Sequence, residues 1–189
     1  MDLWGNSIGV EGGKAIGEAL KVNASLTSLD TRDNAIDGDG AAQLVAAVLG
    51  SKSLLSFGKV PMKELRADEL TELDLSNKHL GPTEGRVLGG LVAVSASLTS
   101  IGEGGLNLKG NDLGDEGWGA IVAGVCANKD GKIATIDASN ESIGPAGAKL
   151  IGEALTTSVS ASLTEVLAFA LMHTTPPPRP AGVATSMRH

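Results

Sequence analysis

Two stretches of the chain are similar to sites that bind phosphate or calcium, and each lacks a group that the chemistry needs. Gly12-Gly13-Lys14-Ala15 is like part of a phosphate-binding loop, but the first glycine of that spacing falls on Ile8 and no serine or threonine follows the lysine. Asp33–Gly40 is like a calcium loop, but Ala35 and Leu44 stand where oxygen ligands are required. We therefore predict neither site.

Histidine and cysteine offer no nucleophile and no zinc site either. His79, His173 and His189 are scattered along the sequence, and Cys126 is the only cysteine. Cys126 lies beside Val125 in an apolar helical stretch, which favours a buried thiol over a reactive one. One cysteine excludes a disulfide framework. We predict no enzymatic activity, no metal and no cofactor.

The dominant pattern is a repeat. The strings LTSLDTRDNAIDGDGAAQLVAAVL (26–49), LTELDLSNKHLGPTEGRVLGGLV (70–92) and IATIDASNESIGPAGAKLIGEAL (133–155) share one design. An apolar residue precedes each helical stretch at Ile8, Ile36, Leu80, Leu113 and Ile143, with gaps of 28, 44, 33 and 30 residues. A unit of about 28 residues explains these gaps, with insertions at 54–69, at 102–106 and near 128–132.

Each unit predicts a short strand, a turn and a helix. Only 2% of the residues are aromatic although 42% are hydrophobic, so the core must consist of aliphatic side chains. Prolines 82 and 145 stand where a first-turn proline is favourable. Gly12, Gly40, Gly117 and Gly147 recur four residues after the apolar marker. We expect these glycines to let neighbouring helices approach closely.

This pattern resembles the leucine-rich repeats of the ribonuclease-inhibitor subclass, which also occur in NOD-like receptors and Ran GTPase-activating proteins. The resemblance covers about residues 2–168. It implies an α/β fold: a leucine-rich-repeat solenoid, or horseshoe, with parallel β-strands on the concave face and α-helices on the convex face.

The resemblance also implies a ladder of structural asparagines that are buried and bond the backbone of adjacent turns. Asn6, Asn34 and Asn111 occupy that position. In two units the position holds Lys78 and Glu141, and Asn77 and Asn140 stand one residue earlier. Burying an unpaired charge is costly, so we expect re-shaped turns that expose both charged side chains.

Aligning the units places outward-facing strand residues in columns, one residue per repeat and about 5 Å apart. The central column is Asp2, Asp30, Asp74, Asn107 and Asp137; its neighbours are Ser28, Glu72, Ser100, Thr135 and Glu165 on one side and Trp4, Arg32, Ser76, Lys109 and Ser139 on the other. Together they hold six acids and two bases, which is suited to a basic partner. The candidate partner-binding residues are Trp4, Asp30, Arg32, Glu72, Asp74, Lys109 and Asp137.

Two alternatives remain open at this point. The repeated aspartate is also consistent with a turn-stabilising residue that duplication has copied. Trp4 is either an exposed anchor for a partner or a residue that packs against a further N-terminal unit.

Charge and hydropathy narrow the function. The formal net charge of −7 argues against nucleic acid and anionic membrane as partners. No apolar run approaches the roughly 18 residues that span a bilayer, and the first residues do not form a signal peptide, so we expect a cytoplasmic protein. We predict a non-enzymatic protein-interaction module that binds a protein partner, of basic character, on its concave face. The alternatives are a GTPase-activating protein and the sensor fragment of a larger NOD-like receptor.

The predicted domain organisation is simple. Residues 1–172 form one leucine-rich repeat domain of about five units, with a degenerate half-unit at 54–69 that we expect to hold a strand and a loop. Neither end shows a polar cap, so the array is expected to be incomplete at both ends, and self-association through these ends is an alternative. Residues 173–189 are rich in proline and are expected to be a disordered tail.

Overall fold

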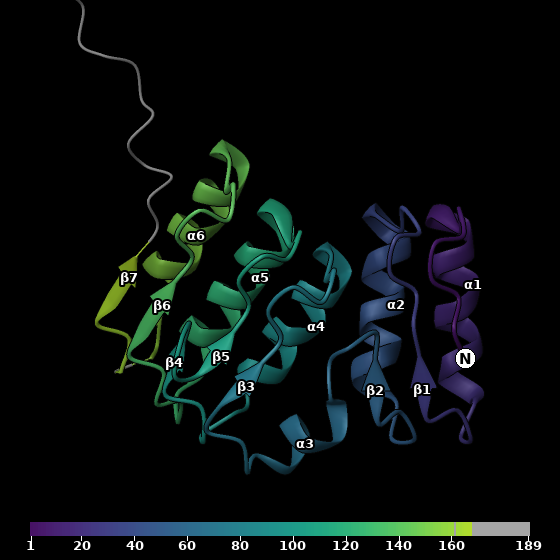
Figure 1. The fold of residues 1–189 in the computed structure, drawn as a ribbon, viewed down its shortest axis with the longest axis horizontal. Helices are drawn as coiled ribbons and strands as arrows, with labels where there is room; N and C mark the ends of the chain where they lie inside the picture. Colours follow the sequence, from purple (N-terminus) through teal and green to yellow (C-terminus); the bar gives the residue numbers. More distant parts are fainter. Residues whose placement is uncertain (161, 168–189) are drawn as a thin grey trace, which may run out of the picture.

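Strands and helices alternate along the chain, with the strands on one side of the molecule and the helices on the other (Figure 1). The computed structural model describes residues 1–160 and 162–167, so the predicted tail at 173–189 lies outside the described residues. The helices are α1 (Gly9–Val22), α2 (Gly38–Gly50), α3 (Met62–Ala67), α4 (Pro82–Val92), α5 (Gly114–Ala127) and α6 (Pro145–Thr156). The strands are β1 (Ser28–Leu29), β2 (Ser56–Phe57), β3 (Leu73–Asp74), β4 (Ser100–Ile101), β5 (Leu106–Asn107), β6 (Thr135–Asp137) and β7 (Glu165–Leu167). The predicted α/β repeat architecture is confirmed.

The named strands pair in parallel but form two separate sheets. One contains β1 and β2, and the other has the order β3-β5-β4-β6-β7. The boundary falls after β2, at the insertion that the sequence marked. We call the part up to β2 the N-terminal block and the part from β3 onwards the C-terminal block.

The insertion at 102–106 changes the strand order. The sequence alignment treated Ser100 and Asn107 as parts of one strand separated by inserted residues. Instead, Ser100–Ile101 and Leu106–Asn107 are two strands, and Ile101 pairs with Leu106. The four residues 102–105 form a tight loop that brings the two parallel strands side by side, with the Gly102 N–H donating to the Leu106 carbonyl at 2.9 Å. One repeat therefore contributes two strands to the sheet.

The half-unit at 54–69 contains a strand and a short helix, where the sequence predicted a strand and a loop. Ser56 and Phe57 pair in register with Ser28 and Leu29, and Phe57 is fully buried. Only four residues, 58–61, separate this strand from the six-residue helix α3. In the preceding unit eight residues, 30–37, lie between β1 and α2.

Asp68 ends α3 and ties it to the next unit. Its backbone is left-handed, with φ of 54°. Its carboxylate accepts hydrogen bonds from the backbone N–H of Ala96 and Ser97 and from the hydroxyls of Ser95 and Ser97, at 2.8 to 3.1 Å. The Ala96 N–H is the largest of the causes that lower the pKa of Asp68 to about 2. Hydrogen bonds to a carboxylate favour its charged form, so Asp68 stays ionised where it closes the loop.

Within each block, glycine brings helix backbones into contact. A Cβ on Gly40 of α2 would collide with the backbone of Val10 in α1, and one on Gly124 of α5 would collide with the Gly89 carbonyl of α4. A Cβ on Gly85 would lie 2.6 Å from the Cα of Gly117. Such contacts leave no room for a side chain, which is the role expected of Gly40 and Gly117. Gly12 does not make such a contact between helices, because a Cβ on Gly12 would collide with the side chain of Ile8 at the start of the same helix.

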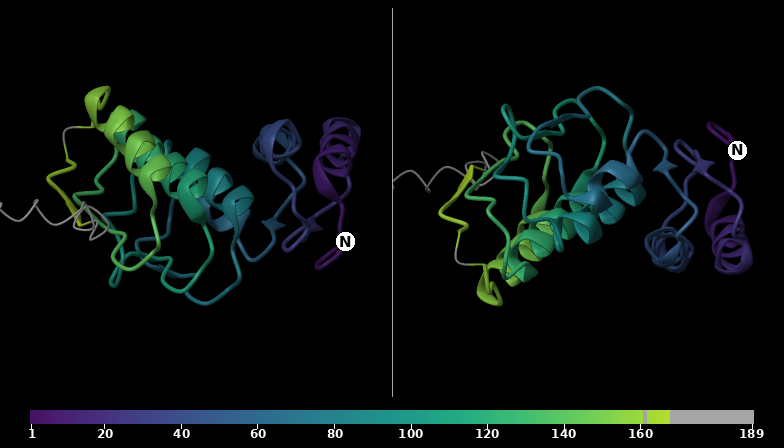
Figure 2. Two further views of the ribbon diagram at one scale, coloured as in Figure 1. Left: turned by 90° about the horizontal axis from the view of Figure 1, so that it is seen from above. Right: turned by 90° about the horizontal axis from the view of Figure 1, so that it is seen from below.

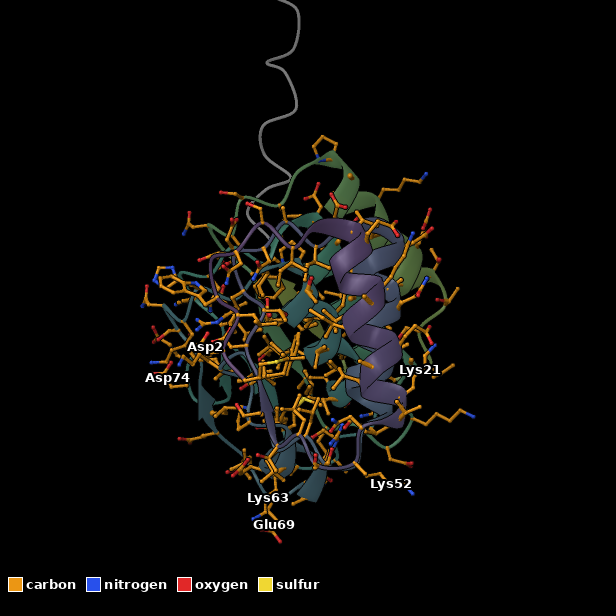
Figure 3. The ribbon with its side chains drawn as sticks, turned by 90° about the vertical axis from the view of Figure 1, so that its right-hand side faces the viewer. Asp2, Lys21, Lys52, Lys63, Glu69 and Asp74 are labelled. Carbon is orange, nitrogen blue, oxygen red and sulfur yellow. The ribbon has the colours of Figure 1, made fainter. Side chains whose placement is uncertain are left out.

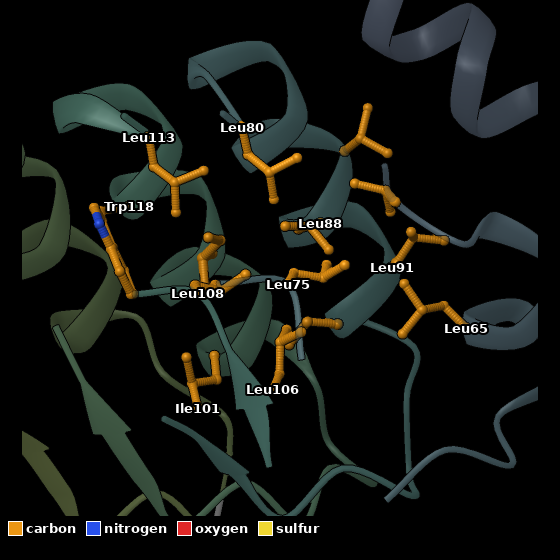
Figure 4. Close-up of a cluster of buried hydrophobic side chains, with 14 of the residues drawn as sticks. Leu65, Leu75, Leu80, Leu88, Leu91, Ile101, Leu106, Leu108, Leu113 and Trp118 are labelled. Atoms are coloured by element: carbon orange, nitrogen blue, oxygen red, sulfur yellow. The ribbon is translucent and has the colours of Figure 1, made fainter. Parts of the chain in front are cut away.

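Aliphatic side chains from successive units stack between the strands and the helices (Figure 4). Leu75, Leu108 and Ile101 come from the strand side, while Leu88 and Leu113 come from the helix side and its leading turn. Trp118 of α5 is the largest fully buried side chain, at 1% exposed, and Phe57 of β2 is the next. These two aromatic residues belong to different blocks.

Candidate functional site

The predicted central column has a common structural role. In each of its members the side-chain Oδ1 accepts a hydrogen bond from the backbone N–H two residues later, at 2.9 to 3.2 Å: Asp2 from Trp4, Asp30 from Arg32, Asp74 from Ser76, Asn107 from Lys109 and Asp137 from Ser139. Hydrogen bonds from Ser76 and Ser139 lower the pKa of Asp74 and of Asp137. The repeated aspartate therefore stabilises the turn after each strand.

The expectation that Asp30 and Arg32 project from an exposed face is wrong. Each is only 8% exposed. The Arg32 guanidinium donates to both carboxylate oxygens of Asp30, at 2.9 and 2.7 Å, and also to the Lys78 carbonyl. Burial acts to raise the pKa of Asp30, but the hydrogen bonds and charge of Arg32 outweigh it and lower the pKa. The pair is a buried structural link, and it reaches from the N-terminal block to the C-terminal block.

The column is also not continuous. β2 and the division between the two sheets separate Asp30 from Asp74, and β4 lies between Asn107 and Asp137. Lys109 contacts Glu103 at 3.2 Å and Asp137 at 3.7 Å, so it neutralises part of the predicted acidic surface. Of the six acids in the three aligned columns, four are exposed and make no ion pair in the described part of the chain: Asp2, Glu72, Asp74 and Glu165. We call these four residues the acidic strand face.

Two members of the acidic strand face lie on the opposite side of the molecule from two lysines of the N-terminal block. Viewed from the N-terminal end, Asp2 and Asp74 project on the left, beyond the strands and turns, whereas Lys21 and Lys52 project beside the helices on the right (Figure 3). Trp4 is 55% exposed, and its indole N–H donates to Asp33 at 2.6 Å. Trp4 is therefore held against the following turn while most of its ring faces solvent.

Two asparagines bond across adjacent turns. Asn34 accepts the backbone N–H of Asn6 at 2.8 Å and donates to the carbonyls of Leu3, Thr31 and Arg32. Asn111 accepts the N–H of Lys78 and of Leu80, both at 3.0 Å, and donates to the carbonyls of Leu75 and Leu108. The side-chain amide of Asn6 instead donates within its own turn, to Leu3 and Trp4.

The two turns without an asparagine in this position keep the backbone of the other turns, so the expected re-shaping is wrong. The residue before the ladder position is left-handed in all five units, with φ of 68°, 56°, 52°, 71° and 62° at Gly5, Asp33, Asn77, Gly110 and Asn140. The Lys78 side chain is exposed, whereas Glu141 is half-buried. The expected exposure therefore holds for Lys78 and only in part for Glu141.

A cavity of about 480 Å³ lies where the half-unit interrupts the array. Its walls are the turn before α2, the start of α4 and the turn before α5: residues 31–37, 79–84 and 110–112. We call it the seam pocket. Figure 2 shows the wider spacing between α2 and α4 than between the helices of either block.

Glu84 of α4 is the most unusual residue of the seam pocket. It is only 2% exposed, its Oε2 accepts the Gly81 N–H at 3.0 Å, and its Oε1 is buried with no hydrogen-bond partner among the described residues. Burial raises the pKa of Glu84 to about 7. An acid in the first turn of a helix, as Glu84 is in α4, is ordinarily exposed, and the burial of Glu84 depends on a neighbouring turn that only the fold reveals.

Other predicted chemistry can be placed briefly. Cys126 is buried as a free thiol. In the described part of the chain, no group of three histidine, cysteine, aspartate or glutamate side chains is arranged to hold a metal ion. None of the helices in that part has the length and apolar character needed to cross a bilayer.

Comparison with known proteins agrees with the repeat architecture. A family model described as "Leucine Rich repeat" matches residues 22–45 and 106–122, which run from the strand region into α2 and α5. A similar solved structure is the tropomodulin C-terminal domain of Caenorhabditis elegans, at 17% identity and a TM-score of 0.40, covering 82% of this chain and 81% of that chain. A search of curated proteins gave no match. The two matched segments are similar to leucine-rich repeats, and they lie in parallel strand–helix units of the kind that the sequence predicted.

Proposed function

We propose that the chain is a non-enzymatic protein-interaction module that binds a basic protein partner through its acidic strand face. Leucine-rich repeats are generally protein-interaction modules, and a repeat array offers a long surface in place of a deep cleft. The observation that supports a basic partner is the acidic strand face, whose four exposed carboxylates have no ion pair in the described structure. A cytoplasmic location is part of the proposal, because the one cysteine is a buried thiol.

The residues best suited to test this proposal are Glu72 and Glu165. Both are exposed, and neither makes the turn-stabilising hydrogen bond of the aspartates. Reversing Asp30 or Asp137 would disturb a turn as well as the surface charge. Glu72→Lys with Glu165→Lys therefore changes the charge of the face and leaves the turns intact.

The experiment measures binding of a labelled oligolysine peptide by fluorescence anisotropy at several salt concentrations. The matched control is Glu18→Lys with Glu64→Lys, which makes the same change in net charge away from the strand face. We expect the strand-face pair to weaken binding about tenfold, or about 1.4 kcal/mol, and the control pair to weaken it less than twofold. Equal losses in both variants would show attraction by net charge alone and would refute the proposal.

A further inference from the structure

The seam pocket exists because the half-unit supplies a strand but no full turn. The four residues 58–61 connect β2 to α3, so nothing fills the space beside the turn that precedes α2. Across this space the two blocks touch through side chains. Arg32 donates to the Lys78 carbonyl, Thr83 donates to the Ile36 carbonyl at 3.3 Å, and the Leu49 side chain lies over Gly90.

Carboxylates dominate the charge around this pocket. Glu84 is buried in its wall, and Asp33, Asp37 and Asp112 are exposed at its rim. The basic or titratable nitrogen groups within the lining are Arg32, which Asp30 already neutralises, and the exposed His79, while the exposed Lys78 and Lys59 lie beside it. The pocket thus has an excess of negative charge and one buried acceptor, Glu84 Oε1, that lacks a donor.

From these features we propose that the seam pocket binds the side chain of a lysine from a partner protein, with its ammonium group directed at Glu84. The inference rests on the proposed function for the nature of the partner, but it uses a separate site. An ammonium group suits the site better than a guanidinium. Glu84 Oε2 already accepts the Gly81 N–H, so only the buried Oε1 lacks a donor, whereas a guanidinium binds best to two carboxylate oxygens. The exposed rim carboxylates attract the cation, and the aliphatic part of lysine suits the remaining wall of Ile36, Leu80 and Pro82.

Occupancy of this site has a signature that surface attraction lacks. An ammonium group beside Glu84 would stabilise the charged carboxylate and lower its pKa from about 7. At a pH near that value the binding step therefore releases a fraction of a proton. Calorimetric titration in two buffers of different ionisation enthalpy measures this release.

The test uses the full chain and Nα-acetyl-lysine methylamide as the probe, followed by NMR of the backbone amides and by calorimetry. We expect shifts at Gly81 and Asp112, proton release near pH 7, and weaker effects with the arginine analogue. The Nε-acetylated probe, which has no charge, should cause no shift. Glu84→Gln should abolish proton release and weaken binding about fivefold or more, because it removes the charge and keeps an oxygen for Gly81. The proposal would be overturned if Glu84→Gln bound the probe with the affinity of the native chain. It would also be overturned if the probe caused no chemical-shift changes at the pocket residues of the native chain.

Glu116→Gln is the matched control, because Glu116 occupies the same third position of α5 but is exposed and paired with Arg86 at 2.6 Å. It should bind the probe like the native chain. Asp112→Asn tests the rim without altering the buried acid, and it should weaken binding less than Glu84→Gln does. Glu72→Lys with Glu165→Lys should leave the pocket shifts unchanged. If the probe binds the pocket but the strand-face variant binds oligolysine as the native chain does, this inference is retained and the proposed function is rejected. If the strand-face variant loses oligolysine binding but the probe does not bind the pocket, the proposed function is retained and this inference is rejected.

Discussion

Helices α1 and α2, and likewise α4 and α5, pack backbone to backbone, but α2 and α4, which face each other across the half-unit, meet through side chains. At the α1–α2 and α4–α5 interfaces glycines stand where any Cβ would strike the neighbouring backbone. We call the boundary between α2 and α4 the seam. There, the atoms nearest to a Cβ on Gly90 would be those of the flexible Leu49 side chain. The seam instead holds the buried pair of Asp30 and Arg32, the buried Glu84 and a cavity. Where close stacking is lost, polar groups and open space replace it, and these are the features suited to binding.

The largest expected effect tests whether the two blocks unfold together. Trp118→Ala and Phe57→Ala each remove a large, fully buried side chain, and each should cost about 4 kcal/mol. If coupling across the seam is weak, hydrogen exchange measured by mass spectrometry will show faster exchange mainly in the block that carries the substitution. Equal loss of protection in both blocks for either variant would mean that the seam transmits stability as well as the glycine interfaces do.

A smaller effect concerns the pH dependence of the seam. Glu84 has an ordinary pKa of 4.5 and a folded-state pKa of about 7, so the folded protein keeps a proton that the unfolded chain releases. The contribution is complete below pH 4.5 and disappears as the pH rises through 7, a loss of about 3 kcal/mol in the free energy of unfolding. Urea unfolding across this pH range should show the decline in the native chain. In Glu84→Gln most of the decline should be lost, and what remains should come from Glu141, whose pKa burial also raises. If the variant keeps the native slope, the decline belongs to a group other than Glu84.

The finest comparison uses three glycine-to-alanine changes. Gly124→Ala should cost about 2 kcal/mol because its Cβ meets a backbone carbonyl that cannot move aside. Gly90→Ala should be nearly neutral, because the Leu49 side chain can adjust. Gly152→Ala has nothing within 4 Å and should stabilise the helix by about 0.5 kcal/mol. Thermal unfolding ranks the three, and a cost at Gly90 as large as that at Gly124 would show that the seam is packed as tightly as the blocks.

The sequence predicted the repeat, the strand–helix order and the glycine contacts at positions 40 and 117, because these depend on periodicity and local sterics. It failed where the outcome depends on neighbours that no alignment of units reveals. The burial of Asp30 and Arg32 requires a partner carbonyl at Lys78, 46 residues away along the chain. The extra strand at 106–107 requires the chain to loop back inside an insertion and to continue in the same direction beside β4. The seam pocket exists because the half-unit lacks the full turn between its strand and its helix, and no residue type in the sequence indicates such a gap.

The hydrogen bond from each column aspartate to the N–H two residues later has a consequence for how such arrays change over time. A duplicated unit inherits the aspartate because its own turn requires it. Each added unit therefore also adds negative charge to the same face, unless asparagine replaces the aspartate as at position 107 or a basic residue pairs with it as at positions 30 and 137. The electrostatic field of the face then grows with the number of units before any partner selects for it. Affinity for basic proteins can thus arise as a by-product of turn geometry. Residues such as Glu72, which make no turn-stabilising hydrogen bond, are then free to change and to adjust that affinity.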